Sequence, residues 1–147
     1  MIMAEKENYC VILMAEDDPD DRLIVHQAFL EIGGEWDLRF VEDGEELMHY
    51  LRRVKNNADP LLSIRPEFIL LDLNMPKKDG RQALMEIKAD PDLRKIPVVI
   101  WTTSKETGDR VQCEKNGADS YITKPGGYAE LVDILRELVS RYCSEQS

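Results

Sequence analysis

The sequence predicts a doubly wound α/β domain built on a five-stranded parallel sheet, with helices on both of its faces. Short apolar segments alternate with helical segments along the chain, which is typical of successive strand–helix units. The apolar segments are continuous, as in strands that are buried on both faces of a parallel sheet. The chain has 147 residues, the length of one domain, and 43% of them are hydrophobic, which is enough for one core.

Runs of aliphatic and aromatic residues mark the predicted strands. In chain order these are Tyr9–Ala15, Leu38–Val41, Phe68–Asp72, Val98–Trp101 and Ser120–Thr123. The second and the last carry the weaker signal, because they are short and less apolar than the others. Parallel strands need crossover connections, so we expect right-handed crossovers through the intervening helices.

Capping residues, helix breakers and apolar stripes mark the predicted helices. Asp18 followed by Pro19 favours a helix start, and the glycine pair after Ile32 ends this helix. A second helix is predicted from an apolar stripe of Leu47, Tyr50, Leu51 and Val54. Further helices are expected at residues 80–89, 105–116 and 128–142. The last has the clearest stripe, formed by Tyr128, Leu131, Val132, Leu135, Val139 and Tyr142.

The predicted domain spans nearly the whole chain. It covers residues 9–143, and residues 1–8 and 144–147 are expected to be loose tails. Residues 53–66 form the one long connection, which we expect to be a surface loop. The N-terminal segment lacks the basic start and the long apolar middle of a signal peptide.

The charge balance excludes several kinds of partner. The chain has 19 basic and 29 acidic residues and a formal net charge of −10. Nucleic-acid binding needs a basic face, and docking on an anionic membrane needs positive charge, so we expect neither. No apolar run approaches the roughly 20 residues of a membrane span. The three cysteines are an odd number without metal-site spacing, so we expect a reduced chain in the cytoplasm.

Polar side chains follow the predicted strands at the edge where ligands bind in open α/β sheets. Glu16 and Asp17 follow the first strand, and Asp72 ends the third. Thr102 follows the fourth strand, and Lys124 follows the fifth. The carboxyl ends of parallel strands lie at one edge, so these side chains should meet there. We call this edge the rim.

The side chains expected at the rim suit phosphoryl chemistry on a metal ion. Asp17, Asp72 and a nearby backbone carbonyl are the oxygen ligands that Mg²⁺ prefers. An ionised Asp72 could attack a phosphorus atom and form an aspartyl-phosphate. Lys124 and the metal would then neutralise the transferred oxygens, and Thr102 could donate a hydrogen bond to one of them.

The order of these motifs resembles the receiver domain of two-component response regulators. The matching residues are Glu16-Asp17, Asp72, Thr102 and Lys124-Pro125, and the resemblance extends over about residues 9–143. It implies the five-stranded (βα)5 receiver fold. It also implies a phosphoacceptor protein that phosphorylates and dephosphorylates only itself, rather than an enzyme acting on other molecules.

The resemblance assigns a role to each site residue. Asp72 would be the phosphoacceptor, and Lys124 would pair with the phosphoryl group. Asp17, Asp72 and the backbone carbonyl of Asn74 would hold Mg²⁺, with Glu16 acting through water. Thr102 and Tyr121 match the switch pair, in which the threonine moves toward the phosphate and the aromatic ring turns inward. A strand tyrosine can equally be a core residue.

A finer resemblance is to the single-domain regulators paired with phytochromes. It rests on the long connection at residues 53–66 and on two segments after it, PEFILLDLNMPKKDGR and IPVVIWTTS. The resemblance implies a sensor histidine kinase, such as a phytochrome, or a phosphotransfer protein as phosphodonor. The signal would leave by conformational change or onward phosphotransfer. It also allows a homodimer through the fourth helix, fifth strand and fifth helix, where Tyr128 and Tyr142 would lie unless they belong to the core.

Two features depart from the family pattern, and other interpretations remain. Gly126-Gly127 stand where the family often has an aromatic residue, which puts the usual docking geometry in question, and Glu16 replaces the commoner aspartate. The bulky Trp101 should point away from the site.

The other acids near the first helix start fit simple capping: Asp18, Asp20 and Asp21. The alternative functions are a Mg²⁺-dependent aspartyl-phosphate hydrolase and a flavin-binding module of the same topology.

Overall fold

A parallel sheet of five strands forms the centre of the structure, a computed structural model that describes residues 10–57 and 63–143. The strand order is β2-β1-β3-β4-β5. The strands are β1 Cys10–Ala15, β2 Trp36–Val41, β3 Phe68–Leu71, β4 Val98–Thr102 and β5 Ser120–Thr123. The predicted α/β fold with a parallel sheet is confirmed. The expected tails and part of the 53–66 loop lie outside the described residues.

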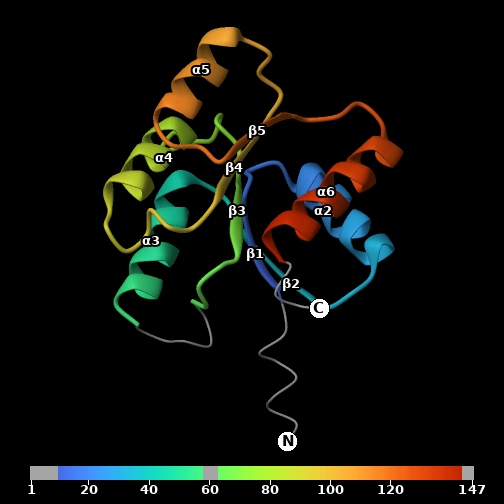
Figure 1. Cartoon of the computed structure of the whole chain (residues 1–147), viewed down its shortest axis with the longest axis horizontal. Coiled ribbons are helices and arrows are strands. Elements are labelled where there is room, and N and C mark those ends of the chain that lie inside the picture. Colours follow the sequence, from blue (N-terminus) through green and yellow to red (C-terminus); the bar gives the residue numbers. More distant parts are fainter. Residues whose placement is uncertain (1–9, 58–62, 144–147) are drawn as a thin grey trace, which may run out of the picture.

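Helices cover both faces of the sheet (Figure 1). They are α2 Pro19–Ile32, α3 Gly44–Lys55, α4 Gly80–Ala89, α5 Thr107–Lys115 and α6 Tyr128–Tyr142. Helices α3, α4 and α5 lie on one face, and α2 and α6 lie on the other. Within the described ranges, no helix combines the length and the apolar character needed to cross a membrane.

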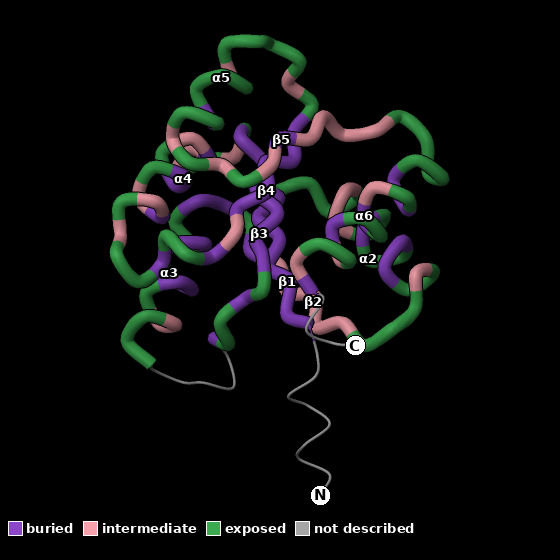
Figure 2. The backbone as a smooth tube through the Cα atoms, viewed as in Figure 1, coloured by how far each residue is buried: buried purple, intermediate pink, exposed green. Residues whose placement is uncertain are grey.

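The core consists of two apolar layers, one on each face of the sheet. Strand β1 contributes to both, because successive side chains point to opposite faces. Leu13 and Ala15 pack in the layer beneath α3 and α4, while Ile12 and Met14 pack in the layer beneath α2 and α6. Figure 2 shows the buried segments concentrated along the strands. This two-sided burial explains why the strands read as continuous apolar runs.

An aspartate side chain caps the N-terminus of each of the helices α2, α3 and α4. The side chain of Asp18 accepts the backbone N–H of Asp20 (2.9 Å) at the start of α2. In the same way, the side chain of Asp43 accepts the backbone N–H of Glu46 at the start of α3, and that of Asp79 accepts the backbone N–H of Arg81 at the start of α4. Such caps satisfy backbone donors that the helix leaves unpaired, and each typically contributes about 1 kcal/mol. They therefore fix the loops that lead from the strand ends into the helices.

Some element boundaries differ from the sequence prediction. Strand β2 begins at Trp36 rather than Leu38, because Trp36 and Asp37 already pair with Cys10 and Val11 of β1. Helix α5 is shorter than expected.

Tyr128 was placed in the apolar stripe of the last helix, but it is 43% exposed. Tyr142 does pack inward, with its ring centroid 5.3 Å from that of Phe68.

The cysteines differ from the expected reduced state. Cys10 at the start of β1 and Cys143 after α6 form a disulfide with their Cα atoms 5.8 Å apart. Both residues are buried. Cys113 is free and lies in the layer beneath α5. The pairing joins positions 133 residues apart in the chain, so spacing within the sequence carried no sign of it.

A close backbone approach fixes the loop after β3. Gly80, the first residue of α4, donates its backbone N–H to the carbonyl of Leu73 (3.0 Å). A Cβ at position 80 would lie 2.2 Å from the backbone oxygen of Asp72. Only glycine allows α4 to begin this close to the loop. The start of α4 thus positions the backbone of Asp72.

We expect the disulfide to make thermal stability depend on redox conditions. Closing so long a loop reduces the entropy of the unfolded chain. Reduction should therefore lower the Tm by about 10 °C, measured by circular dichroism with and without dithiothreitol. The variant Cys143→Ser should melt at the same temperature in both conditions. Equal melting of the wild type in both conditions would contradict the pairing.

We expect Gly80→Ala to destabilise the fold by about 1–3 kcal/mol, because the added methyl group must displace the Asp72 backbone. Urea denaturation measures this loss. The matched control is Gly108→Ala in α5, where an added Cβ meets no atom within 4 Å. That variant should be neutral or gain up to about 1 kcal/mol of helix propensity. Equal effects at the two positions would show that the close approach does not exist.

Candidate functional site

The register of the strands brings the predicted site residues together at the rim. Ala15 on β1 pairs with Leu71 on β3, so Glu16 and Asp72 leave the sheet side by side. Thr102 on β4 pairs with Thr123 on β5, so Lys124 leaves the sheet next to Thr102. The backbone N–H of Lys124 donates to the Thr102 carbonyl (2.8 Å).

Three carboxylates meet at the rim. One oxygen from each of Glu16, Asp17 and Asp72 lies within 4.8 Å of the others. Glu16 is only 1% exposed and Asp72 only 6%, whereas Asp17 is open to solvent. Like charges this close repel one another, and burial removes the water that would screen them. The cluster therefore needs positive charge.

Lys124 supplies a positive charge to this cluster. Its Nζ lies 2.8 Å from Glu16 Oε1 and 2.7 Å from Asp21 Oδ2. Asp72 Oδ2 is farther away, at 3.6 Å. The ammonium is mostly buried, so these ion pairs are screened less than surface pairs. Lys124 thus bridges the first and third strand ends across the rim.

Burial changes the proton affinity of the buried acids. It raises the pKa of Glu16 to about 7, despite the opposing hydrogen bond from Lys124. Burial also raises the pKa of Asp72, and the charge of Lys124 works against this. The pKa of Lys124 itself is raised: burial acts to lower it, but the hydrogen bonds to Asp21 and Glu16 outweigh that effect. A cation at this cluster would favour the ionised carboxylates.

The donor set of the cluster fits a hard divalent cation. All three side chains offer carboxylate oxygens, and no nitrogen or sulfur ligand belongs to the cluster. Oxygen-only donors suit Mg²⁺ or Mn²⁺. Beyond Asp72 the loop turns back, because the backbone N–H of Asn74 donates to Asp72 Oδ1 (3.3 Å). The Asn74 backbone is thereby held next to the cluster.

Thr102 at the end of β4 and Tyr121 in β5 both form a hydrogen bond with Ser104, in the loop after β4. Thr102 is fully buried, and its Oγ1 accepts the backbone N–H of Ser104 (3.2 Å). The Tyr121 ring is buried, and its hydroxyl donates to the Ser104 carbonyl (3.3 Å). The guanidinium of Arg110 lies 5.7 Å from the centre of this ring. Burial raises the pKa of the Tyr121 hydroxyl, so it is a neutral donor.

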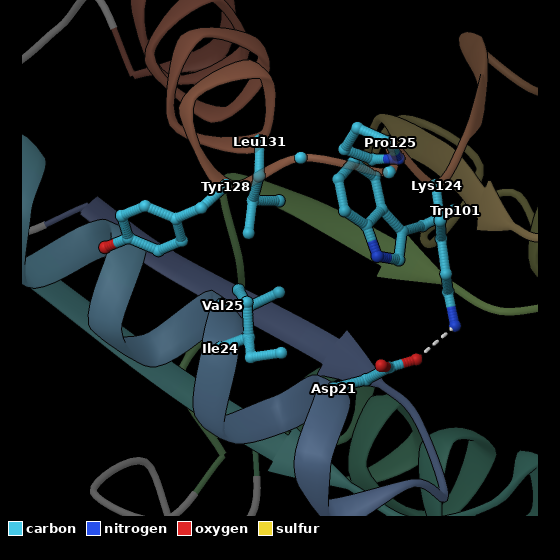
Figure 3. Close-up of a pocket in the computed structure, with 10 residues that line it drawn as sticks. Asp21, Ile24, Val25, Trp101, Lys124, Pro125, Tyr128 and Leu131 are labelled. Carbon is cyan, nitrogen blue, oxygen red and sulfur yellow. Dashed lines mark hydrogen bonds and ion pairs between the residues drawn. The ribbon is translucent and has the colours of Figure 1, made fainter.

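Asp21 is the site residue that the sequence interpretation missed. It was assigned to the helix start, and it does lie in the first turn of α2. Its carboxylate also accepts a hydrogen bond from Lys124, drawn as a dashed line in Figure 3. No spacing in the sequence marks this contact, because Asp17 precedes the helix and Lys124 is 103 residues away from Asp21.

A pocket of about 200 Å³ opens beside Lys124, between α2 and α6 (Figure 3). Trp101 lines it, and this side chain packs in the core layer beneath α2 and α6. Ile24 and Tyr128 stand at its sides. Gly126 and Gly127 form its edge, and added Cβ atoms there would meet nothing within 4 Å. The glycine pair thus leaves space next to the rim.

Fold and site together match one family. A family model described as the response regulator receiver domain matches residues 12–136. The chain belongs to this family. The family match therefore favours the receiver domain over the hydrolase and the flavin-binding module.

Similar proteins include regulators associated with phytochromes. Response regulator Rcp1 of Synechocystis is 36% identical over 130 residues, which cover 88% of this chain and 86% of Rcp1. A structure of Rcp1 in its Mn²⁺-bound form superposes with a TM-score of 0.76 at 36% identity, over 89% of this chain and 92% of that one.

Two further solved structures are informative. The phosphorylated cyanobacterial phytochrome response regulator RcpA has a TM-score of 0.83 at 34% identity, covering 95% of this chain and 97% of that one. The receiver domain of the sensor histidine kinase PA1611 from Pseudomonas aeruginosa, with a magnesium ion in its active-site cleft, has a TM-score of 0.69 at 27% identity, covering 92% and 98%.

We expect millimolar Mg²⁺ to raise the Tm by about 5 °C, because the ion binds the folded acid cluster and not the open chain. Differential scanning fluorimetry with and without the metal measures this shift. Asp17→Asn should abolish most of it. Asp20→Asn is the matched control, since Asp20 lies in the same helix start but outside the cluster. The absence of a shift in the wild type would count against a metal site here.

Proposed function

We propose that Asp72 accepts a phosphoryl group from a histidine kinase or a phosphotransfer protein, in a reaction that depends on Mg²⁺. One observation supports this above the others. The buried Asp72 carboxylate lies in a cluster with two further acids, and the ammonium of Lys124 is 3.6 Å away from it. A cluster of acids that can hold a metal ion, next to the buried ammonium of Lys124, suits a doubly charged phosphoryl group.

We propose Mg²⁺ as the ion, held by Asp17, Asp72 and the backbone carbonyl of Asn74, with Glu16 acting through water. Glu16 has a reason for its indirect role, because one of its oxygens is already bound to Lys124. The solvent exposure of Asp17 leaves space for the waters that Mg²⁺ retains. When bound, the ion neutralises charge on the transferred oxygens.

Asp72, Lys124 and Thr102 would each have a separate role in the transfer of the phosphoryl group. A carboxylate oxygen of Asp72 forms a bond to phosphorus while the bond from phosphorus to the donor nitrogen breaks, and the donor keeps that electron pair. Lys124 can turn from Glu16 and Asp21 toward a transferred oxygen, since Asp72 is already 3.6 Å from its Nζ. Thr102 can donate its hydroxyl hydrogen, because its oxygen already accepts from Ser104.

We propose Thr102 and Tyr121 as the switch pair. Ser104 links them, since its N–H binds Thr102 and its carbonyl accepts from Tyr121. A movement of Thr102 toward a phosphoryl group would pull on Ser104 and change the hydrogen bond of Tyr121. The conformational signal would then leave through β5 and the helices beside it.

We propose two protein contacts. The phosphodonor would bind at the rim beside the pocket, where the exposed apolar side chains of Leu23, Ile24 and Tyr128 offer area to bury. A homodimer would use α5, β5 and α6, where Val111 is exposed and charges of both signs alternate. We place this exchange in the cytoplasm, where a kinase obtains its phosphoryl group from ATP.

We expect acetyl phosphate with Mg²⁺ to add one phosphoryl group to the wild type, detected by intact mass spectrometry. Asp72→Asn should abolish this labelling, because an amide oxygen is a far weaker nucleophile. The matched control is Asp18→Asn, also near the rim, which keeps a side chain able to cap α2. Labelling of Asp72→Asn at the level of the wild type would disprove the assignment of the phosphoacceptor.

A further inference from the structure

Ser104 is the centre of a hydrogen-bond network outside the acidic cluster. Its backbone binds Thr102 on one side and Tyr121 on the other, as described above. Its side chain adds a third bond, because Oγ donates to Asp109 Oδ2 at 2.6 Å. The same Oγ lies 3.4 Å from the backbone N–H of Glu106, which donates to it. The loop after β4 is therefore held from several directions at one residue.

Asp109 in turn is held by Arg81 across the gap between α5 and α4. Arg81 Nε donates to Asp109 Oδ1 and Nη2 to Oδ2, both at 2.9 Å. This two-pronged geometry fixes the carboxylate in orientation as well as in distance. The hydrogen bonds from Arg81 and Ser104 keep the pKa of Asp109 below its usual range. The remaining nitrogen of Arg81, Nη1, binds Asp79, the cap of α4.

Helix α4, which carries Arg81, begins in close contact with the backbone of Asp72. Arg81 follows Gly80, whose Cα approaches the Asp72 carbonyl so closely that a Cβ would lie 2.2 Å from its oxygen. Ser104, Asp109 and Arg81 thus connect the loop directly after Thr102 with the loop that carries Asp72. The two loops have no covalent link between them other than the chain through α4 and β4.

We propose that Arg81 and Asp109 are positioning residues, which hold Ser104 and thereby aim the Thr102 hydroxyl at the phosphoryl site. This inference rests on the function proposed above. Thr102 Oγ1 accepts the N–H of Ser104, so the position of Ser104 decides where the remaining hydroxyl hydrogen can point. Without Asp109, the side chain of Ser104 loses its charged partner and the loop loses its connection to α4.

The test measures the rate of phosphorylation by acetyl phosphate in four proteins: the wild type, Asp109→Ala, Thr102→Ala and the double variant. Asp109→Ala should slow phosphorylation by about 5- to 20-fold, as for a misplaced hydrogen-bond donor. In the Thr102→Ala background the same change should cost less than about 2-fold, because its target is already gone. An equal loss in both backgrounds would overturn the proposal, and so would no loss in the wild type.

Mg²⁺ affinity separates positioning from general damage. Calorimetric titration should give the same affinity for Asp109→Ala and the wild type, because the acid cluster is untouched. A rate loss that comes with a matching loss of Mg²⁺ affinity would overturn the proposal. The control Asp133→Ala removes an exposed aspartate of α6 and should change neither quantity.

Arg81 provides an independent variant if Asp109→Ala does not fold. Arg81→Gln should slow phosphorylation as much as Asp109→Ala does. Arg81→Lys should be faster than Arg81→Gln but slower than the wild type, because lysine keeps the charge but cannot bind both oxygens of Asp109 at once. A rate for Arg81→Gln equal to that of the wild type would overturn the proposal. A wild type that takes no label on Asp72 would instead refute the proposed function, so the two failures can be told apart.

Discussion

The interaction on which the site depends is the ion-pair contact of Lys124 with acids from different elements. Glu16 and Asp72 follow separate strands, and Asp21 belongs to a helix, yet all three face one ammonium. Buried carboxylates destabilise a fold unless opposite charge or hydrogen bonds compensate them. Lys124 provides this compensation in the protein without metal. The same ammonium lies 3.6 Å from Asp72, so the role proposed for it toward a phosphoryl group would fall to the side chain that also compensates the buried acids.

A second constraint is the way the backbone carries these side chains. Parallel register places the residues after β1 and β3 next to each other, and Gly80 allows α4 to begin against the Asp72 carbonyl. Aspartate caps then fix the helix starts around the rim. The acids therefore lie in short segments directly after the strand ends, and the following helix starts hold these segments in place. Such rigid support is what a site for precise group transfer requires.

Local patterns in the sequence predicted the fold, and they predicted which side chains lie together at the rim. Continuous apolar runs indicated the parallel sheet, and residues after the strand ends indicated the rim. Asp21 was missed because a carboxylate in a first helical turn already has an ordinary explanation. The bonds of Arg81 with Asp109 and of Cys10 with Cys143 join distant segments, and no local spacing announces them. Tyr128 was misplaced because its position fits an apolar stripe that α2 does not fully cover.

The disulfide has a consequence for how the molecule comes apart. Cys10 lies at the start of the first strand and Cys143 follows the last helix, so the bond turns the intervening chain into a covalent ring. A protease that cuts this ring once leaves two pieces that are still joined through the sulfurs, and they can separate only after a reductant opens that bond.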